Sequence, residues 1–241
     1  KEVARYTLPG KNDPITNGDR LYVSEAVKGK RGFFRLHAFD MKANEKLWTS
    51  VEMANTREGG FRYCEKAPVF RDGKMYWCRY SGVYCICCET GGIIWQQKME
   101  SGPFSSPTLY KGLLLVATQG GTLSALDCKS GAKKWQTTVE GYASYRPNVI
   151  NEHVFFNGRH SLYAAGLKAM PAKENMLGKV LWSYATKVLT LKMSRRDIKL
   201  AARPVQRPPS FTEKSVIVYS ADSRSPVVSL CRLTGREQWS W

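Results

Sequence analysis

Five of the seven cysteines fall within one short segment, where thiol chemistry or metal binding must be considered first. They are Cys64, Cys78, Cys85, Cys87 and Cys88, whereas Cys128 and Cys231 stand alone. Structural zinc sites use paired thiolates spaced C-x₂₋₄-C, normally twice. The last three cysteines of the cluster instead lie on an expected strand, where neighbouring side chains point to opposite faces. We interpret the cluster as buried small hydrophobic side chains, with metal binding as the alternative, and predict that the thiols are reduced.

The other residues that could do chemistry do not form a recognisable catalytic pattern. The three histidines, His37, His153 and His160, are far apart in the sequence and show no H-x-x-x-H spacing. The chain has no phosphate-binding G-x-x-x-x-G-K-[ST] loop, no G-x-S-x-G elbow and no H-E-x-x-H helix. The sequence therefore predicts a non-enzymatic protein without a catalytic residue, cofactor or metal ion.

Basic residues are the strongest remaining functional signal. The 241-residue chain has a formal net charge of +17 and a pI near 9.7, which favours binding to acidic protein surface, RNA or an anionic membrane surface. One basic cluster lies early in the chain, and a second occupies an expected insertion at 187–209, which otherwise holds only Asp197 as an acid. The candidate residues for partner or anion binding are Lys28, Lys30, Arg31 and Arg35 in the first cluster and Lys187, Lys192, Arg195, Arg196, Lys199, Arg203 and Arg207 in the second. A solvated loop without a partner is the plain alternative for the second cluster.

A repeated spacing shows which elements must position these residues. The segment 125–135 reads ALDCKSGAKKW, and the same spacing from a small residue to a Trp recurs in HAFDMKANEKLW, YCICCETGGIIW and VSLCRLTGREQW. A fifth copy keeps only Gly178 four residues before Trp182. Each copy follows a Pro, a turn and an apolar or aromatic segment, as in APVFRDGKMYW and SPTLYKGLLLV. Each unit thus predicts four short strands joined by turns, which is typical of a β-propeller blade.

The predicted fold is an all-β propeller of four-stranded antiparallel blades, with about five blades in a single domain over 1–241. The expected blades cover approximately 14–54, 66–102, 105–142, 145–190 and 205–241, with the basic insertion 187–209 between the last two. The alternatives are a closed ring of five blades, a ring completed by another chain, and part of a larger propeller. No apolar run approaches the roughly 18–20 residues of a spanning helix.

The repeat A-x-D-x-x-T/S-G-x-x-x-W resembles the tryptophan-docking repeat of PQQ-like, or quinoprotein-type, β-propellers. The resemblance implies that one indole per blade packs against the next blade, at Trp48, Trp95, Trp135, Trp182 and Trp239. It also raises the alternative of a redox enzyme that binds PQQ and Ca²⁺, since some members carry a vicinal disulfide and this chain has Cys87 next to Cys88. Both cysteines occupy ordinary positions of the repeat, however, and no acidic cluster matches a calcium site.

The resemblance and the charge together favour a scaffold or accessory subunit that contacts protein partners through basic loops. The second hypothesis is an RNA-binding component of an organellar ribonucleoprotein, and the third is a degenerate quinoprotein-type redox enzyme. Membrane-surface contact is also consistent with the charge. Basic composition with free thiols favours an organelle matrix or the cytosol over a secreted location.

Overall fold

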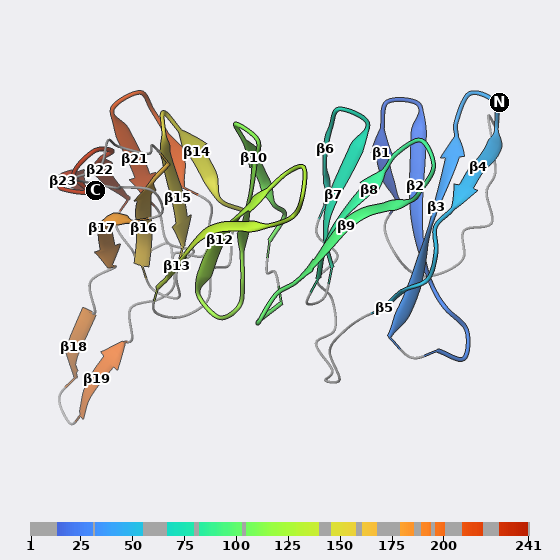
Figure 1. The fold of residues 1–241 in the computed structure, drawn as a ribbon. Helices are drawn as coiled ribbons and strands as arrows, with labels where there is room; N and C mark the ends of the chain where they lie inside the picture. Colours follow the sequence, from blue (N-terminus) through green and yellow to red (C-terminus); the bar gives the residue numbers. More distant parts are fainter. Residues whose placement is uncertain are drawn as a thin grey trace, which may run out of the picture. The chain divides into compact units, whose positions relative to one another are not determined.

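The architecture consists of antiparallel strands throughout the part of the chain that a computed structural model describes (Figure 1). That part comprises residues 14–30, 32–54, 67–79, 82–102, 105–139, 146–157, 161–167, 179–185, 189–193, 196–200, 209–218 and 227–240. It contains strands and no helix, so it also contains no helix with the length and apolar character needed to cross a bilayer. The predicted all-β class with four-stranded antiparallel sheets is confirmed.

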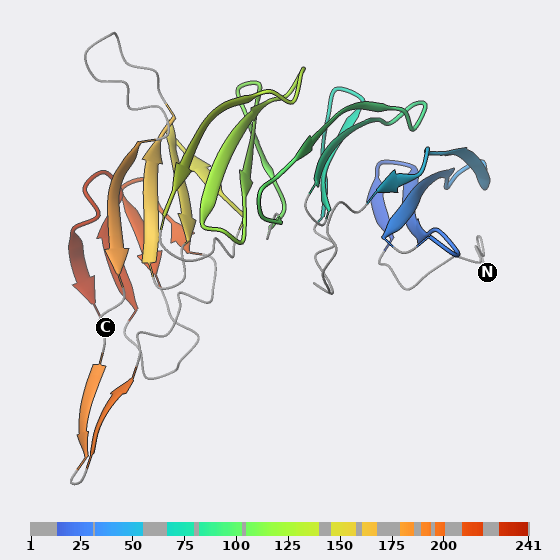
Figure 2. The ribbon, with the colours of Figure 1, turned by 60° about the horizontal axis from the view of Figure 1, so that its bottom comes forward.

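The strands form successive sheets in chain order, and each sheet is a simple meander (Figure 2). The first contains β1 (Ile15–Asn17), β2 (Arg20–Ala26), β3 (Phe33–Asp40) and β4 (Glu45–Thr49), with β5 (Met53–Ala54) paired to β3. The second contains β6 (Val69–Arg71), β7 (Lys74–Arg79), β8 (Gly82–Cys87) and β9 (Ile93–Lys98), and the third contains β10 (Thr108–Tyr110), β11 (Leu113–Ala117), β12 (Thr122–Asp127) and β13 (Lys133–Thr138).

The remaining strands form two further meanders and one separate hairpin. The fourth sheet contains β14 (Asn148–Ile150), β15 (His153–Asn157), β16 (Ser161–Gly166) and β17 (Val180–Ala185). The fifth contains β20 (Ser210–Phe211), β21 (Ser215–Val218), β22 (Val228–Cys231) and β23 (Glu237–Ser240). Between them, β18 (Leu189–Met193) pairs antiparallel with β19 (Arg196–Leu200), so part of the predicted basic insertion is a hairpin.

The first turn of the second and third sheets is tight because its two central residues adopt positive φ. Asp72 and Gly73 have φ of 50° and 69°, and Lys111 and Gly112 have φ of 43° and 79°. Two consecutive residues with positive φ are the mark of the type I′ turn, whose twist matches that of the flanking strands. Glycine at the second position adopts this conformation without a steric penalty.

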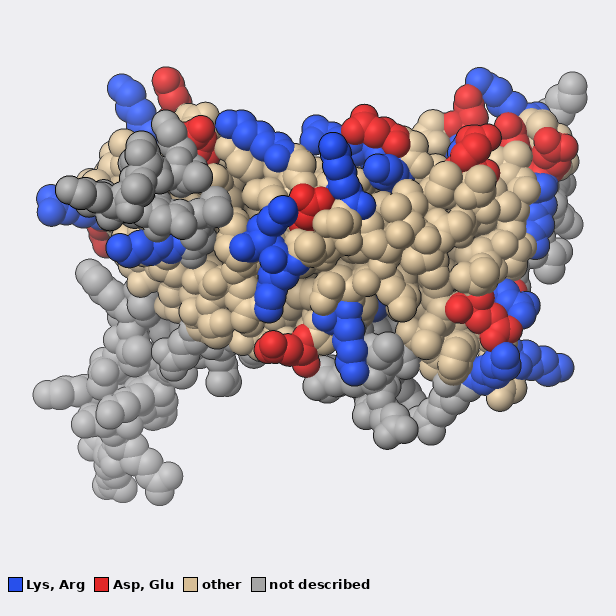
Figure 3. Space-filling view, in the orientation of Figure 1, with Lys and Arg blue, Asp and Glu red and all other residues tan. Residues whose placement is uncertain are grey.

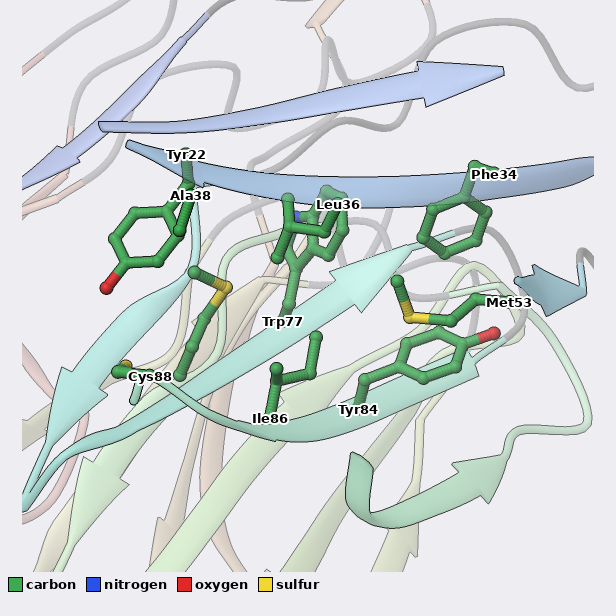
Figure 4. Close-up of a cluster of buried hydrophobic side chains, with 10 residues drawn as sticks. Tyr22, Phe34, Leu36, Ala38, Met53, Trp77, Tyr84, Ile86 and Cys88 are labelled. Atoms are coloured by element: carbon green, nitrogen blue, oxygen red, sulfur yellow. The ribbon is translucent and has the colours of Figure 1, made fainter. Parts of the chain in front are cut away.

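The chain divides into two compact units, each with a core between facing sheets. The first unit comprises residues 1–114 and 126–132, and the second comprises residues 115–125 and 133–241. In the first unit, side chains of β2 and β3 point toward those of β7 and β8, as Figure 4 shows for Leu36, Phe34, Trp77 and Tyr84. In the second unit, buried residues of β15 and β16 pack with those of β21 and β22. The first and second sheets therefore bury a face against each other, and so do the fourth and fifth sheets.

Candidate interaction surface

A β-bulge lies directly before four of the repeat tryptophans, on the fourth strand of their sheets. The register between the third and fourth strands shifts immediately after the pairs Ala38–Trp48, Cys85–Trp95, Ala164–Trp182 and Ser229–Trp239. In every pair the residue opposite the indole is small and has no exposed surface. A bulge re-aims the side chains that follow it, and a small partner leaves room for the ring. This explains why the sequence keeps Ala, Cys or Ser ten residues before Trp.

Three of the indoles rest directly on a glycine of the next sheet. A Cβ atom added to Gly91 would lie 2.4 Å from Cε3 of Trp48, and one added to Gly131 would lie 2.6 Å from Cε3 of Trp95. A Cβ atom added to Gly235 would lie 2.6 Å from both Cε3 and Cδ2 of Trp182. All three glycines have positive φ, between 69° and 74°. Glycine is thus required at this position for two reasons: the positive φ and the absence of a side chain beneath the ring.

A hydrogen bond fixes each of these three rings. The indole Nε1 of Trp48 donates to the carbonyl oxygen of Cys88 at 2.9 Å, and Trp95 donates to Cys128 at 3.0 Å. Trp182 donates to the carbonyl oxygen of Arg232 at 3.0 Å. The acceptor is always the residue three positions before the docking glycine. These contacts hold successive sheets of each unit together by one repeated arrangement.

Trp135 and Trp239 differ from the other three tryptophans of the repeat. Within the described residues, the buried Nε1 of Trp135 has no hydrogen-bond partner, and the turn of the fourth sheet that would receive it lies outside those residues. Trp239 is 45% exposed, and all four residues of β23 are exposed.

The carboxylates of the repeat stabilise the turn between the third and fourth strands of their own sheet. In the first sheet, Oδ1 of Asp40 accepts hydrogen bonds from the backbone N–H groups of Lys42 and Ala43 at 2.8 and 2.9 Å. In the third sheet, Oδ1 of Asp127 accepts from the N–H groups of Lys129 and Ser130 at 2.9 and 3.0 Å. Aspartate commonly stabilises turns in this way.

Cysteine takes the place of aspartate in the second and fifth sheets. Hydrogen bonds from the Thr90 hydroxyl and from turn N–H groups lower the pKa of the Cys87 thiol, and Thr234 does the same for Cys231. The neighbouring Cys88 is buried, which raises the pKa of its thiol, as burial also does for Cys78. The vicinal pair therefore has two separate environments, and all the described cysteines are free.

The described residues contain no group of three or more His, Cys, Asp or Glu side chains that could hold a metal ion. Cys64 and His160 lie outside them. His37 is buried, with Nε2 2.9 Å from Glu25 and Nδ1 3.0 Å from Thr49. Nδ1 of His153 lies 3.1 Å from the carbonyl oxygen of Asn151, within its own turn. Both histidines have local partners.

The first basic cluster lies on the hairpin between β2 and β3, and Glu52 balances part of its charge. Nζ of Lys30 lies 2.7 Å from Glu52, and Arg35 binds the other oxygen of the same carboxylate at 2.5 Å. The hydrogen bond from Lys30, assisted by Arg35, lowers the pKa of Glu52. Lys28 is exposed, whereas Arg31 lies outside the described residues. The cluster is therefore less positive than its sequence alone indicates.

Basic and acidic side chains are interspersed on the face drawn in Figure 3 rather than separated into fields of one sign. Of the second basic cluster, the residues Lys187, Arg195, Arg203 and Arg207 lie outside the described part of the chain. Lys192, Arg196 and Lys199 lie on the strands of the β18–β19 hairpin, where only the backbone is described. Their binding role stays a prediction.

A pocket of about 510 Å³ adjoins the first basic cluster. Its wall is formed by the end of the β2–β3 hairpin and by Arg79 at the end of β7. Phe33 and Phe34 are its aromatic residues, and Phe33 is 38% exposed. Nζ of Lys30 lies 5.9 Å from the centroid of the Phe33 ring. The pocket thus combines an apolar wall with positive charge.

Arg79 is held between two aromatic rings. Its guanidinium carbon lies 4.2 Å from the centroid of Phe34 and 4.8 Å from that of Trp77, and the side chain is only 3% exposed. A guanidinium in such a position is attracted by both ring faces. Sequence reasoning did not single out Arg79, Phe33 or Glu52. The aromatic residues next to the basic cluster were the only indication of this pocket in the sequence. Arg79 and Glu52 are distant from the cluster in the sequence and could not be connected with it.

A family model described as outer membrane protein assembly factor BamB matches residues 32–159. The chain is 25% identical over 118 residues to a quinohemoprotein alcohol dehydrogenase of Comamonas testosteroni, a match that covers 42% of this chain and 16% of that protein. Its fold is similar to the crystal structure of BamB from Moraxella catarrhalis, with a TM-score of 0.63 at 16% identity over 93% of this chain and 61% of that one. The dehydrogenase structure from Comamonas testosteroni gives a TM-score of 0.58 at 14% identity, over 95% of this chain and 42% of that one. The chain thus spans less than two thirds of the length of each of these proteins.

Proposed function

Because this chain belongs to the PQQ-like β-propeller repeat family, through the model described as outer membrane protein assembly factor BamB, we propose that it is a non-enzymatic scaffold subunit. The stacked sheets provide a rigid framework whose loops contact protein partners in a larger assembly. The fold is compatible with this role and also with the enzymes that share it. The choice between them depends on how the side chains of the repeat are used.

The observation that carries the proposal is that the polar side chains and thiols of the repeat form hydrogen bonds within their own turns. The carboxylates of Asp40 and Asp127 accept hydrogen bonds from their own turns, and the thiols of Cys87 and Cys231 replace them at the equivalent positions. The indoles of Trp48, Trp95 and Trp182 serve sheet packing. At the described positions of the repeat, these side chains therefore make contacts that stabilise turns and sheet packing.

The pocket at the β2–β3 hairpin is the proposed contact site within this scaffold. Phe33 offers an exposed aromatic face at this pocket, whereas Lys30 is already paired with Glu52 and Arg79 is buried. Aromatic residues are enriched at interface hot spots because they provide a large contact area. We infer that the partner presents an apolar side chain to Phe33.

Quantitative co-purification of the tagged chain from its own cells tests this function. The wild-type chain is compared with Phe33→Ala, and Leu233→Ala serves as the matched control because Leu233 is also an exposed apolar residue, in the second unit. Loss of an aromatic hot spot costs at least about 2 kcal/mol, or about 30-fold in affinity. Protein partners that are lost with Phe33→Ala and retained with Leu233→Ala are the expected result.

The same experiment distinguishes the other functions. Binding through phosphate contacts would fall by about 10³–10⁵ between 50 and 200 mM salt, and ribonuclease would abolish it. Such a result would replace the scaffold proposal by RNA binding. Quinone-dependent alcohol oxidation by the purified chain would replace it by an enzymatic role.

A further inference from the structure

Two buried cysteines, Cys85 and Cys128, come from segments far apart in the sequence and lie at one contact within the first unit. Cys85 pairs with Trp95 across β8 and β9 and with Tyr76 across β7 and β8. The carbonyl oxygen of Cys128 accepts hydrogen bonds from Nε1 of Trp95 at 3.0 Å and from the hydroxyl of Tyr76 at 3.3 Å. These contacts hold the turn of residues 126–132, which belongs to the first unit, against β8.

The hydroxyl of Tyr76 connects the two sulfur atoms. Besides donating to the carbonyl oxygen of Cys128, it makes side-chain hydrogen bonds with the thiols of both Cys85 and Cys128. A tyrosine hydroxyl has one hydrogen to donate and also accepts hydrogen bonds, so it accommodates two thiol donors. Two sulfur atoms that share one hydroxyl are close neighbours, one on the strand and the other on the turn.

The other two docked interfaces of the described residues lack such a pair of thiols. Between the first and second sheets, Cys88 is present, but the residue opposite Trp48 is Ala38. Between the fourth and fifth sheets, the two equivalent positions hold Ala164 and Arg232. Alanine therefore satisfies the packing requirement opposite an indole, and the second cysteine of the pair is not needed for packing.

Burial and charge act on the two thiols in opposite directions. Burial is the larger influence, and it raises the pKa of Cys85 to about 11 and raises the pKa of Cys128 as well. The charge of Lys74 lowers the pKa of both thiols, and Arg71 also lowers that of Cys128. Cys128 is 9% exposed, whereas Cys85 has no exposed surface. An oxidant from solution therefore meets Cys128 first, and Cys85 is the thiol that follows.

We propose that Cys85 and Cys128 are a site of reversible disulfide formation when the protein meets hydrogen peroxide. Cys128 loses its proton, its sulfur attacks one peroxide oxygen, the O–O bond breaks, and the departing hydroxide takes up the proton to become water. The sulfur of Cys85 then attacks the sulfenic sulfur of Cys128, the S–O bond breaks, and the oxygen leaves as water with the Cys85 proton. The two sulfurs are oxidised by two electrons in total, and the peroxide is reduced to two water molecules.

The product would join β8 of the second sheet covalently to the turn of residues 126–132. This is the contact that otherwise depends on the indole and hydroxyl hydrogen bonds to Cys128. A disulfide brings its Cβ atoms to about 3.5–4.5 Å from each other, so the turn and the strand draw together when the bond forms. The inference goes beyond the proposed scaffold function and does not depend on it.

Peptide mapping of the whole folded chain after oxidation tests the proposal. The reduced protein is treated with hydrogen peroxide, free thiols are blocked with N-ethylmaleimide in urea, and unreduced digests are analysed by mass spectrometry. We expect the peptides of Cys85 and Cys128 to be joined with the loss of two hydrogen atoms, as the most abundant cross-link, and dithiothreitol to separate them. The urea midpoint of the oxidised protein should rise by about 1 M, because the bond closes the loop of residues 85–128.

Alanine variants assign the bond. Cys85→Ala and Cys128→Ala should each lose the cross-link and the rise in the urea midpoint. Cys78→Ala is the matched control and should keep both, because Cys78 is equally buried and lies on the neighbouring strand β7. The wild-type chain oxidised while unfolded in urea should lose the preference for this pair, since the fold no longer selects the partner.

Any of four results would overturn the proposal. These are the absence of the cross-link in samples in which Cys87 has been oxidised, a different pair such as Cys87 with Cys88 as the main product, equal abundance of the cross-link in the folded and unfolded chain, and a cross-link between two copies that appears as a dimer on a non-reducing gel. If an alanine variant does not fold, the peptide maps of the folded and unfolded wild-type chain still decide.

Discussion

Replacement of Gly91 by alanine is the most direct test of how the sheets are held together. A Cβ at this position would lie 2.4 Å from Cε3, 2.8 Å from Cδ2 and 2.9 Å from Cζ3 of Trp48. All three are atoms of a rigid bicyclic ring, so no rotation of a flexible chain end can relieve the contact. The indole must move away from the turn of the second sheet.

Three costs add for Gly91→Ala. Alanine at φ of +72° is disfavoured by about 1–2 kcal/mol, and forcing a methyl group into a packed site costs a further 1–3 kcal/mol or so. A displaced ring also loses the 2.9 Å hydrogen bond to Cys88, which contributes about 1 kcal/mol. We expect a total loss of about 3–6 kcal/mol in the free energy of unfolding of the first unit.

Gly73→Ala is the matched control in the same sheet. Gly73 has φ of +69°, but a Cβ there would meet no atom within 4 Å. It therefore incurs only the backbone cost of about 1–2 kcal/mol. Urea unfolding followed by far-UV circular dichroism should separate the two variants by about 2–4 kcal/mol.

The Trp48→Ala variant completes a double-mutant cycle with Gly91→Ala. Without the indole, Gly91→Ala should cost no more than Gly73→Ala, because only the backbone term remains. Equal destabilisation by Gly91→Ala and Gly73→Ala in the wild-type background, within about 0.5 kcal/mol, would refute the claim that glycine is required there to receive the ring.

Three further predictions concern individual side chains. Trp95→Phe keeps an aromatic ring but removes the donor to Cys128, so it should lower the free energy of unfolding by about 1–2 kcal/mol in urea titrations. Burial raises the pKa of Tyr22 to about 12, above the unfolded value near 10, so stability is fully present below pH 10 and is lost as pH rises toward 12; unfolding midpoints should show a smaller alkaline loss in Tyr22→Phe. Hydrogen bonds lower the pKa of Cys87 and Cys231 whereas burial raises that of Cys78, so mass spectrometry after brief iodoacetamide treatment at pH 7.5 should find the first two alkylated first; earlier labelling of Cys78 would contradict this.

Much of the fold could be predicted from the sequence because the repeat is encoded by local spacing. In the second and fifth sheets the small residue, turn glycine and Trp lie within ten residues of one another, and strand alternation with tight turns places them in the same way. The same spacing indicated that Cys87 stands at the position of a repeat aspartate, which is the role its thiol has in the turn.

The candidate site could not be predicted to the same extent because its residues meet across strands and sheets. Glu52 lies 17 residues or more from the two cations that it binds, so their charge appeared unbalanced in the sequence. Arg79 reaches Phe34 only because the first and second sheets pack face to face.

The sequence by itself determined the strands, their turns and the face on which each indole lies, because these depend on backbone conformation and side-chain alternation over a few residues. Only the tertiary structure decided which indoles are covered and which charges are balanced. Trp95 and Trp239 have the same local sequence pattern, yet Trp95 is buried against Gly131 and Trp239 is exposed. The burial of an indole depends on the sheet that packs against it, and the local residue spacing does not determine which sheet that is.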